Sequence, residues 1–472
     1  MPSSEIDQTI AAVGYAKVIV TLTSDAAATE RAPRTRGAAS AGGPAGSSLE
    51  NNFIVPSEVQ MESLAATAKN AASRSFRRPQ TLQSRRVRIF PHLGLAIGYV
   101  DAAGAVALET SSAVARVEKA PELSLIKPVS IRPIKPKRIV SWGIARMKIE
   151  RLWAAGFDGA GVLVGHLDTG VDGGHPALKG AIADFAEFDM AGDKVPGAQA
   201  HDSGDHGTHT AGTIVGRPGP KGSFGVAPGA KIASALVIEG GQVIDRILSG
   251  MDWIIESGCR ILSMSLGLRG FTPAFEQIID ALRNAGVLPI IAVGNEGPMT
   301  SRSPGNYDTV LSVGAMDPTD HVADFSSSQK FNRPADPLVP DLVAPGVGVV
   351  SCIPGGGFAE MDGSSMATPH VAGLAAILLQ AMPGATVAQL EQAIIGSCGR
   401  PSSMPTGRAN RGVPDAARAF KLLTGTNVPA PAGVAKAPRL KVARSVSRTA
   451  KSRLPRMPVS TAQKSAGTRG KK

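Results

Sequence analysis

Three short segments of this 472-residue chain carry side chains of the types used in acid–base and nucleophilic chemistry. The segment LDTGVD places Asp168 at the end of an apolar run. GDHGTHTAG holds His206 and His209, and GSSMATPHVAG holds Ser365 at the start of a second apolar run. A histidine that takes a proton from a serine hydroxyl, with a carboxylate to orient the imidazole, turns that serine into a nucleophile. The three segments predict acyl transfer to a serine if the fold brings them together.

Each of these residues also has a structural interpretation without chemistry. Asp168 could cap a helix or stabilise a turn, Ser365 could cap a helix, and His209 could be a core histidine. His206 and His209 could also share a metal ion, but the zinc-binding helix motif is His-Glu-x-x-His and no other cluster of His and Cys completes a site. Gly207 leaves room for a second backbone to approach closely. Residue types alone therefore leave capping and catalysis open.

The elements that must position these residues lie in the second part of the chain. Continuously apolar runs alternate there with helical patterns, which is typical of a parallel sheet covered on both faces. We expect strands at 162–168, 231–238, 260–267, 288–295 and 310–315, and helices at 242–257, 273–286 and 366–382. The predicted fold class is α/β, with a doubly wound and mostly parallel sheet over residues 142–424. Reactive residues of such folds lie at the carboxyl ends of the strands.

The order of the three residues and the strings around them resemble the subtilisin-like serine proteases. The separations are 38 residues from Asp168 to His206 and 159 from His206 to Ser365. This resemblance covers about residues 142–423 and implies a serine endopeptidase that works through an acyl-enzyme. IAVGNEG contains Asn295, which the resemblance makes an oxyanion donor together with the backbone N–H of Ser365.

Two further segments resemble the strands with which this family holds a substrate backbone, SMSLG on one side and EGGQ on the other. The residues assigned to substrate binding in this way are Ser265, Leu266, Gly267, Gly240 and Gly241. Main-chain hydrogen bonds do not depend on sequence, so broad endopeptidase activity on proteins and peptides is expected. An ordinary strand and a glycine turn are the alternatives. Leu268 departs from a second glycine common in the family and predicts a narrower pocket rim.

No cofactor is required by this chemistry, and no metal ligand is assigned. After the histidine motif the chain reads GRPGPKGSFGVAP, where the family often has an asparagine-rich calcium loop. Prolines, Lys221 and the lack of a carboxylate make this a poor site for a hard cation. Structural calcium elsewhere stays open.

Residues 1–127 are expected to form a small α+β module that resembles the family's propeptide, an inhibitor of its own catalytic domain. The strand AKVIVTLT and the patterned stretch from 87 to 127 would form it. Residues of about 24–86, rich in Ala, Ser, Gly and Arg, are expected to be a disordered insertion. A proline- and lysine-rich linker at 128–141 would follow, with cleavage somewhere in 126–141.

The net charge of +12 is confined to residues 425–472, which hold 12 Lys/Arg and no Asp/Glu, so the rest of the chain has 38 of each sign. We expect this basic tail to be disordered. It could bind nucleic acid or another anionic surface, although no aromatic residue there supports base stacking. Binding through the tail and a catalytically silent scaffold are the two alternatives to an active protease.

Three cysteines do not make a disulfide framework, and we expect Cys259 and Cys352 to be packing residues. No stretch approaches about 20 apolar residues, so no transmembrane helix is expected. The N-terminus carries Glu5 and Asp7 and lacks the basic start of a signal peptide. These features predict a monomer that is cytoplasmic or exported by a non-classical route, with the compartment itself unknown.

Overall fold

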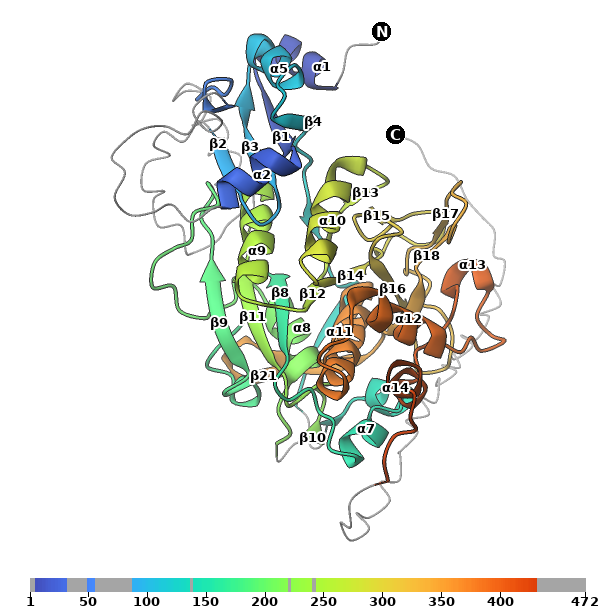
Figure 1. Cartoon of the computed structure of the whole chain (residues 1–472). Coiled ribbons are helices and arrows are strands. Elements are labelled where there is room, and N and C mark those ends of the chain that lie inside the picture. The colour runs from blue at the N-terminus through green and yellow to red at the C-terminus, as the bar shows by residue number, and fades with distance from the viewer. Residues whose placement is uncertain are drawn as a thin grey trace, which may run out of the picture. The chain divides into compact units, whose positions relative to one another are not determined.

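The computed structural model describes residues 5–31, 49–55, 87–135, 139–219, 222–239 and 243–430 (Figure 1). By its contacts the chain divides into a compact unit, Met1–Pro431, and a second unit, Ala432–Lys472. The second unit, most of the predicted basic tail, lies outside the described residues. Predictions for the tail are therefore not tested.

A seven-stranded sheet forms the centre of the larger, C-terminal part of the compact unit, in the order β19-β16-β14-β12-β8-β11-β9. All of its strand pairs are parallel. In that order the strands are Leu342–Pro345, Leu311–Met316, Leu288–Ala292, Ile261–Met264, Leu163–Asp168, Lys231–Leu236 and Ile182–Glu187. The prediction of a doubly wound parallel sheet is confirmed. The apolar runs form buried strands because helices exclude water from both faces.

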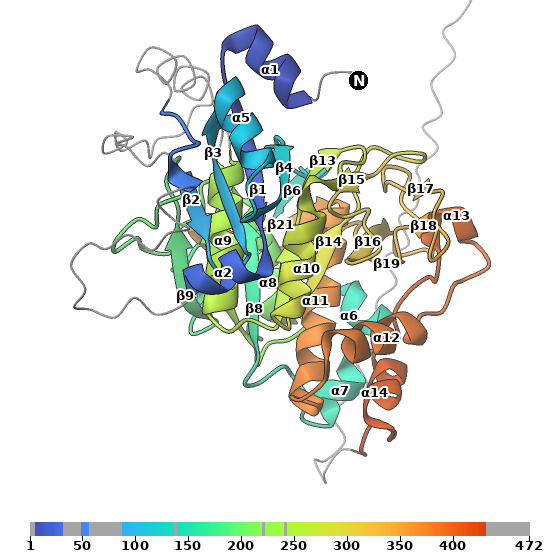
Figure 2. The same ribbon diagram turned by 45° about the horizontal axis from the view of Figure 1, so that its top comes forward.

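Two hydrophobic cores lie on opposite faces of this sheet. The first contains Ile290 of β14 with α8 and α11, and the second contains the next residue, Ile291, with α9 and α10. The main helices are α8 (His206–Val215), α9 (Ile244–Glu256), α10 (Glu276–Asn284) and α11 (Ser364–Ala381). On the α11 side lie α6 (Trp142–Arg146), α7 (Glu150–Ala154), α12 (Val387–Ser397), α13 (Thr406–Ala409) and α14 (Ala416–Thr424) (Figures 1 and 2).

Smaller sheets flank the central one. One has the order β15-β13-β5 and another the order β20-β21-β6. Their strands are β15 (Arg302–Ser303), β13 (Leu266–Arg269), β5 (Ser124–Leu125), β20 (Val349–Ile353), β21 (Gly357–Asp362) and β6 (Ser130–Ile134). The remaining elements are β7 (Ile139–Val140), β10 (Gly222–Ser223), β17 (Gln329–Lys330), β18 (Leu338–Val339), η1 (Pro176–Leu178), η2 (Pro273–Phe275) and η3 (Pro354–Gly356).

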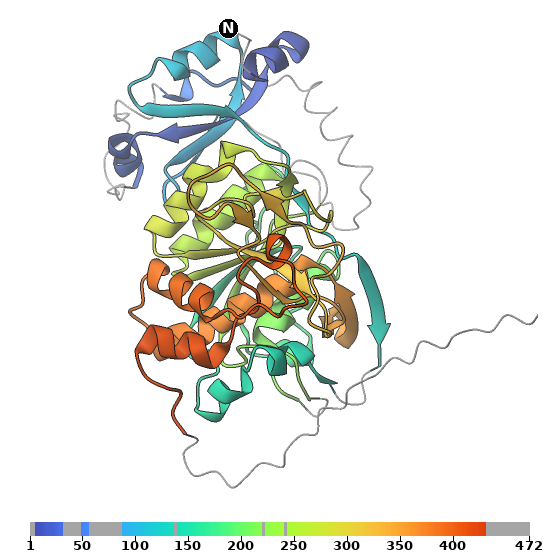
Figure 3. The same ribbon diagram turned by 90° about the vertical axis from the view of Figure 1, so that its right-hand side faces the viewer.

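The N-terminal module is an antiparallel sheet of order β2-β3-β1-β4, and its described residues also form three short helices. Its elements are α1 (Glu5–Val13), β1 (Ala16–Leu22), α2 (Ser24–Arg31), β2 (Val87–Phe90), β3 (Leu95–Val100), α5 (Ala102–Glu109) and β4 (Val114–Lys119). Successive side chains of β1 are buried in two different hydrophobic cores, because they point to opposite faces of the strand. Val18 and Val20 pack within the module, whereas Ile19 joins the core that contains α9 and α10. The module is thus an α+β unit that packs on the part of the compact unit that holds the seven-stranded sheet, as Figure 2 shows for β1 and α9 and Figure 3 shows from the side.

Polar contacts reinforce this packing. Lys17 pairs with Asp245 of α9, and Asp252 of the same helix accepts hydrogen bonds from the backbone of His92 and Leu93 at 2.8 and 3.1 Å.

The structure differs from the predicted boundaries of the insertion at two places. Ser24–Arg31 forms α2, and Leu49 and Phe53 are buried in the core of the module. These residues are ordered because Ala27, Leu49 and Phe53 cover the open face of β1 and β3. Other residues of the predicted insertion lie outside the described ranges.

Candidate active site

Asp168 and His206 meet where strand β8 ends and helix α8 begins. Asp168 is the last residue of β8 and His206 the first of α8. His206 Nδ1 lies 2.7 Å from Asp168 Oδ1, and both side chains are buried. A Cβ on Gly207 would lie 2.0 Å from the carbonyl oxygen of Gly170, so the predicted close backbone approach is present. The glycine lets the helix begin directly against the turn that follows Asp168.

The second oxygen of Asp168 faces a different histidine. Thr210 Oγ1 lies 3.1 Å from Asp168 Oδ2 and 2.9 Å from His166 Nε2, and His166 Nδ1 lies 2.9 Å from Ser234 Oγ. The charged carboxylate is the strongest acceptor near the Thr210 hydroxyl, so we assign its proton to Asp168. His166 then donates from Nε2 to Thr210 and accepts from Ser234 at Nδ1.

Burial and charge set the ionisation of this cluster. Burial lowers the pKa of His166 to about 4, so it is neutral at pH 7 and can have the single N–H that this assignment requires. Burial alone would raise the pKa of Asp168, but the charge and hydrogen bond of His206, with smaller help from His166 and Thr169, hold it below its ordinary value. Asp168 is therefore an anion beside two imidazoles.

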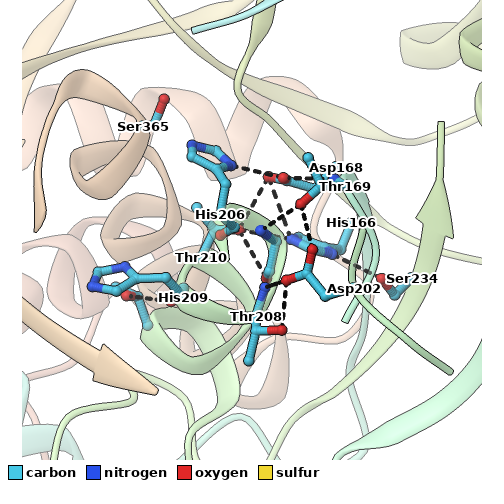
Figure 4. A network of polar contacts seen from close by, with 12 residues as sticks. His166, Asp168, Thr169, Asp202, His206, Thr208, His209, Thr210, Ser234 and Ser365 are labelled. Carbon is cyan, nitrogen blue, oxygen red and sulfur yellow. Dashed lines mark hydrogen bonds and ion pairs between the residues drawn. The ribbon is translucent and has the colours of Figure 1, made fainter. Parts of the chain in front are cut away.

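Ser365 lies in the first turn of α11 and is fully buried. Figure 4 shows the ring of His206 between Asp168 on one side and the helix that carries Ser365 on the other. Ser365 Oγ donates to the carbonyl oxygen of Ile126 at 2.6 Å, and His206 Nε2 has no hydrogen-bond partner among the described residues. The nitrogen that would accept a proton is thus unoccupied, while the hydroxyl is held by another part of the chain.

Asn295 follows β14 and is oriented by Ser364, the serine next to Ser365. Asn295 Oδ1 accepts from Ser364 N and Ser364 Oγ at 2.8 and 2.9 Å, so its Nδ2 must point the other way. Asn295 Nδ2 donates to the carbonyl oxygen of Lys127 at 2.9 Å. A Cβ on Gly363 would lie 3.2 Å from Asn295 Nδ2, so a side chain at this position would press on the Asn295 amide.

Residues 124–134, which we term the resident segment, run through this site. On one side β5 pairs antiparallel with β13, Leu125 opposite Leu266 and Ser124 opposite Gly267. On the other side β6 pairs antiparallel with β21. The carbonyls of Ile126 and Lys127 lie between these pairings, at Ser365 and Asn295. The chain's own backbone therefore lies where a bound polypeptide would be attacked.

The residues assigned to substrate binding fall partly within this region. Ser265 O accepts from Ile126 N at 3.0 Å, and Leu266 and Gly267 form the β13 half of the pairing. Leu268 pairs with Ser303 of β15 on the opposite edge. Gly240 and Gly241 lie outside the described residues, so their assignment is not tested.

Other residues singled out in the sequence have structural surroundings. His209 is fully buried, and its Nε2 lies 3.0 Å from Val349 O, which fits the core histidine considered above. Cys259 and Cys352 are free and buried, and burial raises the pKa of each thiol to about 12. The prediction that both are packing residues is confirmed.

The described part of the chain contains neither a cluster of metal ligands nor a membrane-spanning helix. No group of three or more His, Cys, Asp or Glu side chains is placed there to hold a metal ion. No helix among the same residues is long and apolar enough to cross a membrane. Calcium binding through other oxygens is not tested and stays open.

Comparison with known proteins decides the family. The profile of the Subtilase family matches residues 159–420. The chain belongs to the subtilase family. It is similar to Subtilisin E of Bacillus subtilis (strain 168), 33% identical over 300 residues that cover 62% of this chain and 74% of that protein. It is also similar to Subtilisin BL of Lederbergia lenta, 37% identical over 247 residues (52% of this chain, 86% of that protein), and to Alkaline elastase YaB of Bacillus sp. (strain YaB), 36% identical over 280 residues (59% and 67%).

This subtilase is accordingly a serine-type endopeptidase, a hydrolase that acts on proteins. Three residues of its site were not found from the sequence: His166, Thr210 and Ser364. His166 lies in the quoted strand VLVGHLD and Thr210 in the histidine motif, but their contact joins residues 44 positions apart. Ser364 stood beside the proposed nucleophile, and only its contact with Asn295 reveals what it does.

Proposed function

We propose that this subtilase hydrolyses peptide bonds with Ser365 as nucleophile, His206 as general base and Asp168 as the residue that orients His206. The observation that carries the proposal is the 2.7 Å contact of His206 Nδ1 with Asp168, which leaves the buried Nε2 without a partner on the side of Ser365. A carboxylate at Nδ1 fixes the tautomer in which Nε2 is the basic nitrogen.

The reaction proceeds in two halves. Ser365 Oγ bonds to the carbonyl carbon of the substrate as its proton passes to His206 Nε2. His206 then gives this proton to the departing amine, the C–N bond breaks, and an acyl-enzyme remains. A water molecule then attacks the acyl carbon and loses a proton to His206. His206 returns this proton to Ser365 Oγ as the bond between Ser365 and the acyl group breaks, and the acid is released. Asn295 Nδ2 and the Ser365 N–H hold the oxyanion, and Ser364 keeps the Asn295 amide turned toward it.

Broad specificity is the second part of the proposal. The contacts of Ser124, Leu125 and Ile126 with β13 are largely main-chain hydrogen bonds. A substrate strand that takes this place would be held in the same way whatever its side chains are. Gly240 and Gly241 are proposed to line the other side.

The N-terminal module is proposed to inhibit its own catalytic part. The resident segment must leave the cleft before substrate can enter, because it pairs with β13 and engages Ser365 and Asn295. A cut after Ile126 separates residues 124–126 from the rest of the segment, and residues 127–134 then leave the cleft as the new N-terminal stretch. We place cleavage at the Ile126–Lys127 bond, since Ser365 Oγ contacts the Ile126 carbonyl and the next bond ends in the tertiary amide of Pro128. Asn295 Nδ2 donates to the Lys127 carbonyl in this structure, so it has to shift to the Ile126 oxygen when that carbonyl is attacked.

Two measurements test this function. Purified protein should hydrolyse casein, and Ser365→Ala should abolish that activity and leave the 472-residue chain intact. A serine-directed phosphonate should inhibit the unsubstituted protein. The shortened form of the active protein should begin at Lys127 by N-terminal sequencing. Casein hydrolysis by Ser365→Ala would overturn the assignment, and a different N-terminus would overturn the proposed bond.

A further inference from the structure

After the residues that contact Ser365 and Asn295, the resident segment continues as the outermost strand of a small sheet. Val129 N donates to Asp362 O at 2.7 Å. Strand β6 then pairs with β21 over five positions, from Ser130 opposite Asp362 to Ile134 opposite Phe358. The sheet order β20-β21-β6 makes β21 an edge strand once β6 is gone. Figure 2 labels β6 and β21 side by side. An edge strand presents a row of unpaired backbone groups that can hold another extended chain.

The two strands of this pair are anchored very differently. Val129 and Ile131 are 55% and 48% exposed, so the segment is held here mainly by its backbone. In β21 the alternate residues Ala359 and Met361 are fully buried, in a core cluster with Val349 and Met366. β21 therefore stays in place when β6 leaves, and its edge can be occupied again.

The edge of β21 is acidic. Glu360 and Asp362 lie on one face of the strand, and the residue opposite Glu360 is Arg132. Arg132 Nε lies 3.4 Å from Glu360 Oε2, and Arg132 Nη2 lies 3.5 Å from Asp362 Oδ1. Asp362 Oδ1 also accepts from Gly348 N at 2.6 Å, which fixes this carboxylate. A cationic side chain on the added strand thus meets two anions, one of them held in place.

We propose that β21 binds the part of a substrate that follows the cleaved bond, as an added antiparallel strand, and that Glu360 and Asp362 select a basic side chain on it. The selected position is the sixth after the residue whose carbonyl meets Ser365, as Arg132 is the sixth after Ile126. This inference rests on the proposed function and extends it, because the substrate contacts given above all lie before the bond. The substrate class is an extended polypeptide with Arg or Lys at that position.

Internally quenched peptides with one common sequence before the bond test the binding strand. Extending the part after the bond from two residues to eight should raise kcat/KM about tenfold or more, since several main-chain hydrogen bonds are added. An unchanged kcat/KM would overturn the proposal. Failure of the unsubstituted enzyme to cleave even the short peptide would instead overturn the proposed function.

Charge selection is tested with Arg, Ala or Glu at the sixth position of the long peptide. Arg should be preferred to Ala about two- to fivefold, the range of a half-exposed ion pair. Glu360→Gln should remove most of this preference and leave hydrolysis of the short peptide unchanged. Glu256→Gln, an exposed residue at the far end of α9, is the matched control and should keep the preference. An undiminished Arg preference in Glu360→Gln would overturn the assignment of Glu360.

A competition measurement separates the edge of β21 from the rest of the cleft. The peptide PVSIRPIK, the sequence of residues 128–135, should inhibit hydrolysis of the long substrate more than that of the short one. The same peptide with Glu in place of Arg should inhibit more weakly. Equal inhibition of both substrates would contradict binding at β21.

Discussion

The two sides of the Asp168 carboxylate carry two histidines that differ in one respect. His206 uses one ring nitrogen on Asp168 Oδ1 and has no partner at the other among the described residues. His166 uses both nitrogens, on Thr210 and Ser234, and reaches Asp168 only through the Thr210 hydroxyl. A histidine whose nitrogens are both occupied holds neighbours in place, whereas one with a free nitrogen can move a proton. In the proposed mechanism His206 is accordingly the base and His166 a positioning residue at the same carboxylate.

Of the residues around Asp168, His206 should cause the largest loss of kcat when it is replaced. His206→Ala removes the only imidazole with a free nitrogen beside Asp168, so kcat should fall about 10⁴-fold or more while KM changes little. Steady-state kinetics on a short chromogenic peptide measure both constants. If kcat fell less than tenfold, another group would have to be the base.

Replacing Thr210 tests the link between the two sides. Thr210→Val keeps the shape but removes the hydroxyl that donates to Asp168, so kcat should fall about ten- to hundredfold, the value of a hydrogen bond to a charged group. Thr213→Val on the same helix is the control, because Thr213 donates to His209 O instead. Equal kcat and equal pH–rate profiles for both variants would show that the Thr210 hydroxyl does not support catalysis through Asp168.

Replacing His166 should have a smaller effect. His166 Nε2 lies 3.7 Å from Asp168 Oδ2, too far for a direct hydrogen bond, so His166→Leu should lower kcat about three- to tenfold through Thr210. The double variant with Thr210→Val should be no slower than Thr210→Val alone. Additive losses would show that His166 acts by a separate route.

A fourth test is the free energy of unfolding at acidic pH, which should depend on three of the buried histidines. Burial lowers the pKa of His166, His209 and His370 to about 4, 3 and 4, whereas an unfolded histidine titrates near 6.5. The unfolded chain therefore binds more protons below about pH 6.5, and the free energy of unfolding should fall as the pH drops toward 4. Three protons correspond to at most about 4 kcal/mol per pH unit. Asp341 opposes this trend, because burial raises its pKa well above the ordinary value.

Urea unfolding of Ser365→Ala at pH 7 and pH 5 measures this dependence without self-digestion. Adding His166→Gln should reduce the slope by about 1.4 kcal/mol per pH unit. Stability that does not change between the two pH values would contradict the account.

The central sheet and the two anchors of the site could be predicted from the sequence. Continuously apolar runs fix strands such as β8 and β14, and Asp168 and Asn295 follow directly from where those runs end. The close backbone approach at Gly207 was predicted as well, whereas the helix that begins at His206 was not.

The contacts between distant segments could not be predicted. His166 has the pattern of a core residue in an apolar strand, and its partner Ser234 is 68 positions away. The pairing of Ser130–Ile134 with β21 is made by backbone groups, so it does not require particular residue types and cannot be recognised in the sequence. The ordered parts of the predicted insertion were missed because the apolar run of Phe53, Ile54 and Val55 is too short to predict an element, and the burial of Phe53 depends on β1 and β3.

Labelling with a serine-directed phosphonate tests the central claim most directly. Peptide mass spectrometry should find one adduct, on Ser365, in the unsubstituted protein after the resident segment is cut. His206→Ala should not be labelled, because its Ser365 has no base. An adduct on Ser364 or on any other residue, or equal labelling of His206→Ala, would contradict the assignment of Asp168, His206 and Ser365.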